Sequence, residues 1–138
     1  MVANLKRLET HRALVVEDNE HVAYMLEFIL ERAGYEVLIA RHGKEAQAII
    51  SDHADIDVVV LDLMLPYVSG FQLLSEMRAD PEWQHVPVLV LSGKVLEEDI
   101  VKAFDLGAND YVTKPFRPEE LLAWLRRLVN SEKQSSRS

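Results

Sequence analysis

Four short runs of apolar residues recur along the chain with almost no polar residue inside them. They cover residues 13–16, 37–40, 58–61 and 88–91, and a weaker fifth run covers 111–112. Strands without polar alternation are buried on both faces, which is typical of a parallel sheet covered by helices. The runs therefore predict five strands of one parallel sheet.

The segments between these strands carry helical signals. One apolar stripe at helical spacing stops before Gly34, a usual residue after a helix end. Ser69 and Gln72 have the spacing of a capping box. Pro118 suits the first position of a last helix, which we expect to end at Val129. Five repeats of strand then helix predict a doubly wound α/β domain with five helices.

Length, composition and charge restrict the function classes. The chain of 138 residues fits one domain, which we expect over 12–129, between an N-terminal extension (1–11) and a polar tail or linker stub (130–138). No apolar run could cross a membrane, no signal peptide is apparent, and cysteine is absent, so we expect a cytoplasmic protein. A net charge of -8 argues against nucleic-acid binding by the domain.

Polar side chains follow four of the five predicted strands. They are Glu17 and Asp18 after the first strand, Asp62 after the third, Ser92 after the fourth and Lys114 after the fifth. Each alone could be a loop residue or a helix cap. Because ligands of doubly wound folds bind at the carboxyl ends of the strands, their coincidence predicts a functional site.

The chemistry of this set favours phosphoryl transfer with a metal ion. Carboxylates held about 4–6 Å apart repel one another by about 4 kcal/mol per pair, so at least one should have a raised pKa in the absence of a cation. Mg²⁺ (or Mn²⁺) suits such a site because it accepts carboxylate, water and phosphate oxygens; the alternative is an acidic pocket that only caps helices. Asp62 is suited to be the nucleophile, and Lys114 and Ser92 would neutralise the transferred group.

Taken together, the motifs resemble the response regulator receiver (CheY-like) domain along nearly the whole chain. The quoted segments are Glu17-Asp18, Leu61 to Pro66 with Gly70, Leu91-Ser92-Gly93, Gly107 to Tyr111, and Val112 to Phe116. The Leu-Met-Leu-Pro segment after Asp62 is similar to the winged-helix transcription-factor branch. The resemblance implies a flavodoxin-like sheet order of 2-1-3-4-5 and a phosphoryl group received on Asp62 from a sensor histidine kinase.

The resemblance also assigns ligands to the metal. Asp18 and Asp62 would bind it directly, together with the backbone carbonyl of Met64. Glu17, which replaces the family's usual Asp, would act through a metal-bound water. Lys114 would pair with Asp62 and then with its phosphoryl group, and the peptide bond after Lys114 would be cis.

Ser92 and Tyr111 would form the switch of such a domain. A phosphoryl group can draw in the Ser92 hydroxyl by a charge-assisted hydrogen bond, which vacates space for Tyr111. The resemblance places the output surface on the fourth helix, fifth strand and fifth helix, where an output domain, an effector protein or a second copy would bind. Ile100 and Trp124 replace basic residues expected there; Trp124 is either an interface contact or a packed core residue.

Two further positions are predicted to set the lifetime of the phosphoryl group. Met64 and Lys94 flank the line along which water would attack phosphorus, and an apolar Met64 cannot orient that water. We expect slow autodephosphorylation, although Met64 could equally be a generic loop residue.

The alternative function is an aspartyl-phosphate phosphatase of the haloacid-dehalogenase type. Such an enzyme needs a second Asp at the position of Met64 and usually a cap domain, so the sequence disfavours it. A flavodoxin-like cofactor module would need a Gly/Ser/Thr-rich phosphate loop where Glu17 and Asp18 stand. We therefore expect a signalling domain that catalyses only its own phosphorylation and dephosphorylation.

Overall fold

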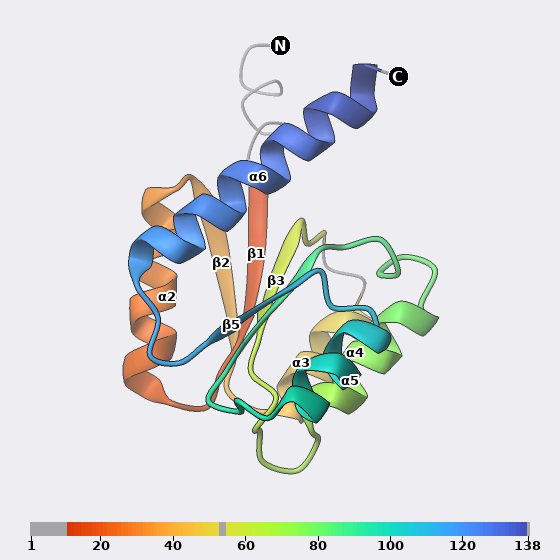
Figure 1. Cartoon of the computed structure of the whole chain (residues 1–138). Coiled ribbons are helices and arrows are strands. Elements are labelled where there is room, and N and C mark those ends of the chain that lie inside the picture. The colour runs from red at the N-terminus through yellow and green to blue at the C-terminus, as the bar shows by residue number, and fades with distance from the viewer. Residues whose placement is uncertain (1–10, 53–54, 138) are drawn as a thin grey trace.

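A computed structural model describes residues 11–52 and 55–137 as one alternating series of strands and helices (Figure 1). The strands are β1 (His11–Val16), β2 (Tyr35–Ala40), β3 (Val58–Leu61), β4 (Val88–Ser92) and β5 (Asp110–Thr113). The helices are α2 (Glu20–Arg32), α3 (Gly43–Ser51), α4 (Gly70–Ala79), α5 (Glu97–Asp105) and α6 (Pro118–Arg137). Every predicted strand is present within one or two residues of its expected bounds.

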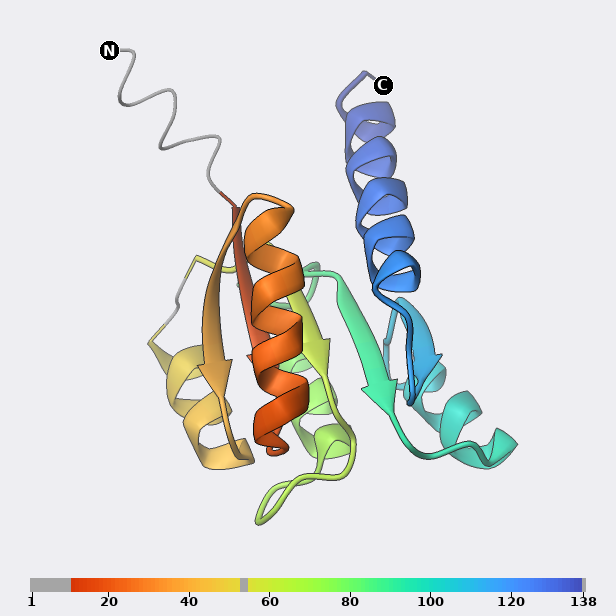
Figure 2. The ribbon, with the colours of Figure 1, turned by 90° about the vertical axis from the view of Figure 1, so that its left-hand side faces the viewer.

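The five strands form one parallel sheet in the order β2-β1-β3-β4-β5, as the resemblance predicts. Alternate side chains of each strand point to opposite faces, so two cores form. Leu14 and Val16 pack with α3, α4 and α5 on one face. Ala13 and Val15 pack with α2 and α6 on the other; Figure 1 shows the sheet between the two helical layers, and Figure 2 views it from the side of α2. The apolar runs of the inner strands β1, β3 and β4 are therefore buried on both faces, whereas those of the edge strands β2 and β5 are only partly buried.

Helix ends follow the local sequence signals. Asn19 caps α2 by accepting a hydrogen bond from the Val22 backbone N–H, and Gly34 follows the helix end with φ +97°. Ser69 caps α4 by accepting from the Gln72 N–H at 3.2 Å. The Gln72 side chain does not complete a capping box, because its amide donates to Glu76 instead.

The last helix is longer than predicted. We expected it to end at Val129, but α6 continues to Arg137. No glycine or proline follows Pro118, so nothing in the sequence ends the helix at Val129. Within the described residues, no helix is both long and apolar enough to cross a membrane. Residues 1–10 of the expected N-terminal extension lie outside the described residues, whereas His11 already belongs to β1.

Arg78, at the end of α4, connects three segments that are separate in sequence. Its guanidinium donates to the carbonyl oxygens of Gly107 (3.0 and 2.8 Å), Trp83 (3.2 Å) and Val86 (2.8 Å), and to Asn109 Oδ1 (3.0 Å). Burial lowers the pKa of Arg78. The planar fork of arginine can satisfy several acceptors at once, so this side chain fixes the turn before β4 and the turn before β5 relative to α4.

Replacing Arg78 by Lys should lower the free energy of unfolding by about 2–3 kcal/mol, because one ammonium cannot satisfy these carbonyls. The measurement is urea unfolding followed by circular dichroism. Arg127→Lys is the control, since the Arg127 side chain is 71% exposed and makes one ion pair, with Asp110. The control should change stability by less than about 1 kcal/mol. Equal effects of the two substitutions would contradict the role of Arg78.

Candidate functional site

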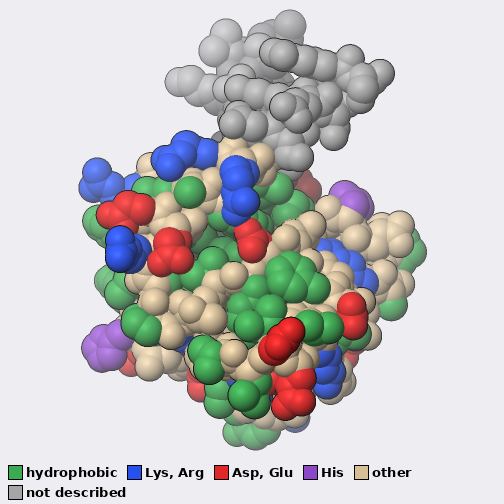
Figure 3. Space-filling view, viewed as in Figure 1, with side chains coloured by type: hydrophobic (Ala, Val, Ile, Leu, Met, Phe, Trp, Pro, Cys, Tyr) green, Lys and Arg blue, Asp and Glu red, His purple; other side chains and the backbone are tan. Residues whose placement is uncertain are grey.

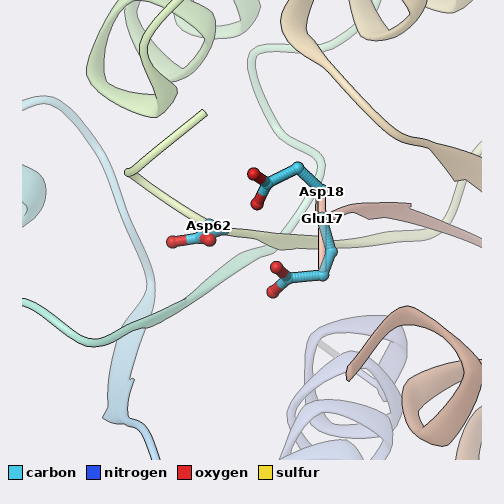
Figure 4. Close-up of side chains that lie close together, drawn as sticks. All are labelled: Glu17, Asp18 and Asp62. Carbon is cyan, nitrogen blue, oxygen red and sulfur yellow. The ribbon is translucent and has the colours of Figure 1, made fainter. Parts of the chain in front are cut away.

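The parallel register brings the acidic residues after β1 and β3 together. Val16 pairs with Leu61, and the Asp62 N–H donates to the Val16 carbonyl at 3.0 Å. Glu17, Asp18 and Asp62 each offer one carboxylate oxygen, and these oxygens all lie within 4.8 Å of one another. Figure 4 shows the three carboxylates pointing to the same side of the strand ends. The predicted convergence of acids is therefore present.

Lys114 supplies the positive charge of this cluster. Its Nζ lies 2.7 Å from Glu17 Oε1 and 3.2 Å from Asp62 Oδ2. Glu17 and Asp62 are 1% and 5% exposed, whereas Asp18 is exposed. The expected pair of Lys114 with Asp62 is present, and the closer contact with Glu17 was not predicted. Spacing in the sequence indicates which strand ends meet but not which of two neighbouring acids a lysine approaches.

The ionisation of the cluster reflects both burial and charge. Burial raises the pKa of Glu17, and the negative charge of Asp62 adds to this, against hydrogen bonds from Lys114 and the Asn19 N–H. Burial alone would lower the pKa of Lys114, but its contacts with Glu17 and Asp62 outweigh burial and raise it. The expectation of a raised carboxylate pKa holds for Glu17, although burial rather than repulsion is its largest cause.

Asp62 is held at both carboxylate oxygens. Oδ1 accepts from the Met64 backbone N–H at 3.1 Å, and Oδ2 accepts from Lys114. The loop after Asp62 folds back on itself, since the Gly70 N–H donates to the Leu63 carbonyl at 3.0 Å. A Cβ atom on Gly70 would collide with the Asp62 backbone oxygen. A side chain at this position would therefore displace the backbone that carries Asp62.

The strands β4 and β5 bring the remaining predicted residues to the same edge of the sheet. Ser92 is buried, and its Oγ accepts from the Lys94 N–H at 3.3 Å. The Lys114 N–H donates to the Ser92 carbonyl, and the Lys114–Pro115 bond is cis, as expected. A Cβ on Gly93 would meet no atom within 4 Å, so open space adjoins Ser92.

Tyr111 reaches from β5 to the loop after β4. Its hydroxyl donates to the Lys94 carbonyl at 2.9 Å, and its ring packs partly against the core on the α3–α4–α5 face. Burial is the largest cause of its raised pKa. The hydroxyl thus contacts the backbone two residues beyond Ser92, and a hydrogen bond with the Ser92 side chain acts against the rise of the Tyr111 pKa. The switch role assigned to Ser92 and Tyr111 remains a prediction.

The two residues predicted to set the phosphoryl lifetime lie in different environments. Met64 is 57% exposed in the loop after Asp62. The Lys94 Nζ lies 3.8 Å from Asp99 Oδ2 in the first turn of α5. The Lys94 ammonium therefore lies toward α5, whereas more than half of Met64 is exposed to solvent.

The donor set fits a hard divalent cation. Three carboxylates converge, one of them exposed, and one lysine neutralises only part of their charge. Oxygen ligands of this kind are those that Mg²⁺ prefers. The residues present are therefore compatible with the expected ion.

Comparison with known proteins agrees with this geometry. The family model of the response regulator receiver domain matches residues 13–126. The chain is 37% identical over 116 residues to the phosphate regulon transcriptional regulatory protein PhoB of Pseudomonas aeruginosa, covering 84% of this chain and 50% of that protein. It is 36% identical over 121 residues to the response regulator SaeR of Staphylococcus aureus, covering 88% and 51%. The chain thus spans about half the length of these curated relatives.

A solved structure is similar over nearly the whole domain. The receiver domain of a sensor histidine kinase from Pseudomonas aeruginosa shows a TM-score of 0.75 at 32% identity, covering 86% of this chain and 96% of that one. Its active-site cleft coordinates a magnesium ion.

Gly70→Ala should lower the free energy of unfolding by about 1–3 kcal/mol, because the added methyl group collides with backbone atoms of Asp62 and Leu63. This loss would occur although Ala favours a helix more than Gly does. Gly93→Ala is the matched control and should stay within about 0.5 kcal/mol, since its methyl group enters open space. Urea unfolding measures both variants. A Gly70→Ala protein as stable as the parent would show that the loop can shift.

Proposed function

The chain belongs to the family of response regulator receiver domains, and from this we propose that Asp62 accepts a phosphoryl group from a sensor histidine kinase in a Mg²⁺-dependent reaction. One observation carries the proposal. Asp62 is nearly fully buried, yet its carboxylate lies between the Met64 N–H and Lys114, beside two further acids. A carboxylate whose only role was to cap a helix would not need an ammonium and two acids around it.

The chemistry follows from this arrangement. A carboxylate oxygen of Asp62 would bond to phosphorus while the phosphorus–nitrogen bond of the donor histidine breaks. Such transfers depend mainly on positioning and on neutralising the charge of the phosphoryl oxygens. Lys114 and the Ser92 hydroxyl lie at the neighbouring strand ends and would supply this neutralisation. Gly93 leaves space beside them for the group to enter.

The metal site is part of the same proposal. Asp18, Asp62 and the backbone carbonyl of Met64 would hold Mg²⁺, or Mn²⁺ in its place, and Glu17 would act through a bound water. The ion would supply positive charge to the phosphoryl oxygens during transfer. The magnesium ion in the cleft of the similar histidine kinase receiver supports this assignment.

This chain lacks the acid–base residue that the alternative function, an aspartyl-phosphate phosphatase, requires. The position two residues after the nucleophile carries Met64, whose exposed thioether can neither donate nor accept a proton in the reaction. The relatives found by comparison are signalling proteins. We therefore infer no catalysis beyond the gain and loss of the domain's own phosphoryl group.

We propose α5, β5 and α6 as the output surface, for an effector protein, an output domain or a second copy; these are the fourth helix, fifth strand and fifth helix of the domain. Asp110 on this surface pairs with Arg127 of the same chain at 2.7 Å. Trp124 is 5% exposed and packs with Leu121 and Leu125, which favours core packing over an interface contact. A homodimer would therefore need contacts other than those of the Asp110 carboxylate and the Trp124 ring.

The proposed organisation and location follow the same reasoning. We propose that residues 1–11 form an N-terminal extension, 12–129 the receiver domain, and 130–138 a polar tail or linker stub, into which α6 continues. Because receiver domains receive their phosphoryl group in the cytoplasm, we propose that this protein is cytoplasmic.

Incubation with Mg²⁺ and acetyl phosphate should give a stoichiometric phosphoryl adduct, detected by intact-mass spectrometry. Asp62→Asn should abolish the adduct because an amide cannot form an acyl phosphate. Asp52→Asn, at an exposed aspartate after α3, is the control and should be labelled like the parent. An adduct on Asp62→Asn, or turnover of many phosphate equivalents per protein, would contradict the proposal.

Met64→Asn should shorten the lifetime of the phosphorylated protein, because a polar side chain there can orient the attacking water. We expect decay about tenfold faster, equivalent to about 1.4 kcal/mol in the barrier. The rate is measured as loss of the adduct after removal of acetyl phosphate. Met64→Leu keeps volume and polarity and should decay at the parent rate. Equal rates for the Asn and Leu variants would show that Met64 does not control the lifetime.

A further inference from the structure

The exposed side of α5 combines apolar and acidic side chains around an open hollow of about 720 Å³. We call this the α5 surface and define it by six residues that line the hollow: Leu96, Glu97, Glu98, Val101, Lys102 and Asp105. Large apolar residues rarely stay exposed in a group, yet Leu96 and Val101 are exposed here, as are Val95 and Phe104 beside them. Figure 3 shows hydrophobic side chains next to acidic ones on the face that carries α5.

The acids of this surface are left uncompensated by the nearby lysines. The Lys102 Nζ lies 4.4 Å from the centre of the Phe71 ring on α4, and Lys94 approaches Asp99. Among the described residues, Glu97, Glu98 and Asp105 have no ion-pair partner. The surface therefore presents apolar side chains within a negative rim.

The combination of apolar and acidic side chains limits which kinds of partner could bind the α5 surface. A second copy bound symmetrically would bring the acids of both copies together, and like charges across an interface oppose binding. Nucleic acids and anionic membrane surfaces carry the same sign of charge and would be repelled. A helical segment with apolar anchors on one side and Lys or Arg beside them complements both features.

A short series of contacts links the α5 surface to Asp62. The Ser92 hydroxyl and the Tyr111 hydroxyl both bind the backbone of Lys94, whose ammonium lies near Asp99 in the first turn of α5. Leu96 caps α5 without any side-chain hydrogen bond, so the start of this helix is held weakly. A change at Ser92 can therefore reach the start of α5 through the loop 93–96.

We propose that the α5 surface docks a cationic, amphipathic helical segment of a partner protein, and that occupation of Asp62 changes the affinity through the Lys94 backbone. The second part rests on the proposed function, and the first does not. By linkage, binding of the partner segment must change the occupation equilibrium of Asp62 by the same factor and in the same direction. The charge of the α5 surface thus specifies the chemistry of the partner.

The test uses a fluorescein-labelled Leu/Lys amphipathic peptide and its Leu/Glu counterpart, titrated with the full chain and followed by anisotropy. The Leu/Lys peptide should bind and the Leu/Glu peptide should not. Backbone amide shifts should locate the peptide on α5 and not at Glu17 and Asp18. Mg²⁺ with beryllofluoride, a phosphoryl mimic, should change the affinity by about fivefold or more.

Matched variants separate specific docking from general attraction to an acidic protein. Glu97→Lys with Glu98→Lys should weaken peptide binding at least tenfold, whereas Glu27→Lys with Glu31→Lys on α2 makes the same change in net charge and should affect it less than threefold. Tyr111→Phe keeps the ring but loses the contact with the Lys94 carbonyl, so it should bind the peptide and lose the beryllofluoride effect.

The outcomes distinguish this inference from the proposed function. Equal weakening by the α5 and α2 pairs, or amide shifts away from α5, would overturn the docking site. Beryllofluoride that shifts the Asp62 amide but leaves the peptide affinity unchanged would overturn the coupling alone. A failure of beryllofluoride to shift the Asp62 amide would count against the phosphoacceptor role and leave the docking result standing.

Discussion

The contact of Lys114 with two buried carboxylates is the interaction on which the site depends. Glu17 and Asp62 are withdrawn from water at the ends of adjacent strands, where unpaired negative charges would be costly. One ammonium compensates both, at 2.7 and 3.2 Å. The same ammonium leaves the exposed Asp18 without compensation, so the cluster keeps an excess of negative charge on its open side. This asymmetry favours the binding of a cation on the open side of the cluster, beside Asp62.

Much of this could be predicted from the sequence, because its signals are local or follow from the parallel sheet. Apolar runs gave the strands, and the rule that carboxyl ends share one edge brought Asp62 near Glu17 and Asp18. The closer Lys114–Glu17 contact could not be predicted, since it depends on side-chain reach across the sheet. Arg78 was also missed, because all but one of its acceptors are backbone carbonyls, which no sequence motif marks. The end of α6 was placed too early because polar residues do not by themselves stop a helix.

The two hydrophobic cores connect the sheet to different helices on its two faces. One core joins α2 and α6 to the sheet and encloses Trp124. The other joins α3, α4 and α5 and includes the ring of Tyr111, which also touches the loop after β4. Chemistry at the strand ends is therefore connected to one helical layer more directly than to the other. Of the proposed output surface, α5 belongs to that layer, whereas α6 belongs to the opposite one.

The hydrogen bonds of the Arg78 side chain affect how α5 can move. Its guanidinium grips the Gly107 carbonyl just beyond the end of α5, while the opposite end begins at a cap without a side-chain hydrogen bond. A helix that is held at one end and free at the other rotates about the held end and does not shift along its axis. Displacement at Ser92 would thus turn α5 about a pivot near Gly107, moving Glu97 and Glu98 through a wider arc than Asp105. The proposed displacement would then be largest at the end of α5 farthest from Arg78, whose guanidinium hydrogen-bonds neither to Asp62 nor to the residues of the α5 surface.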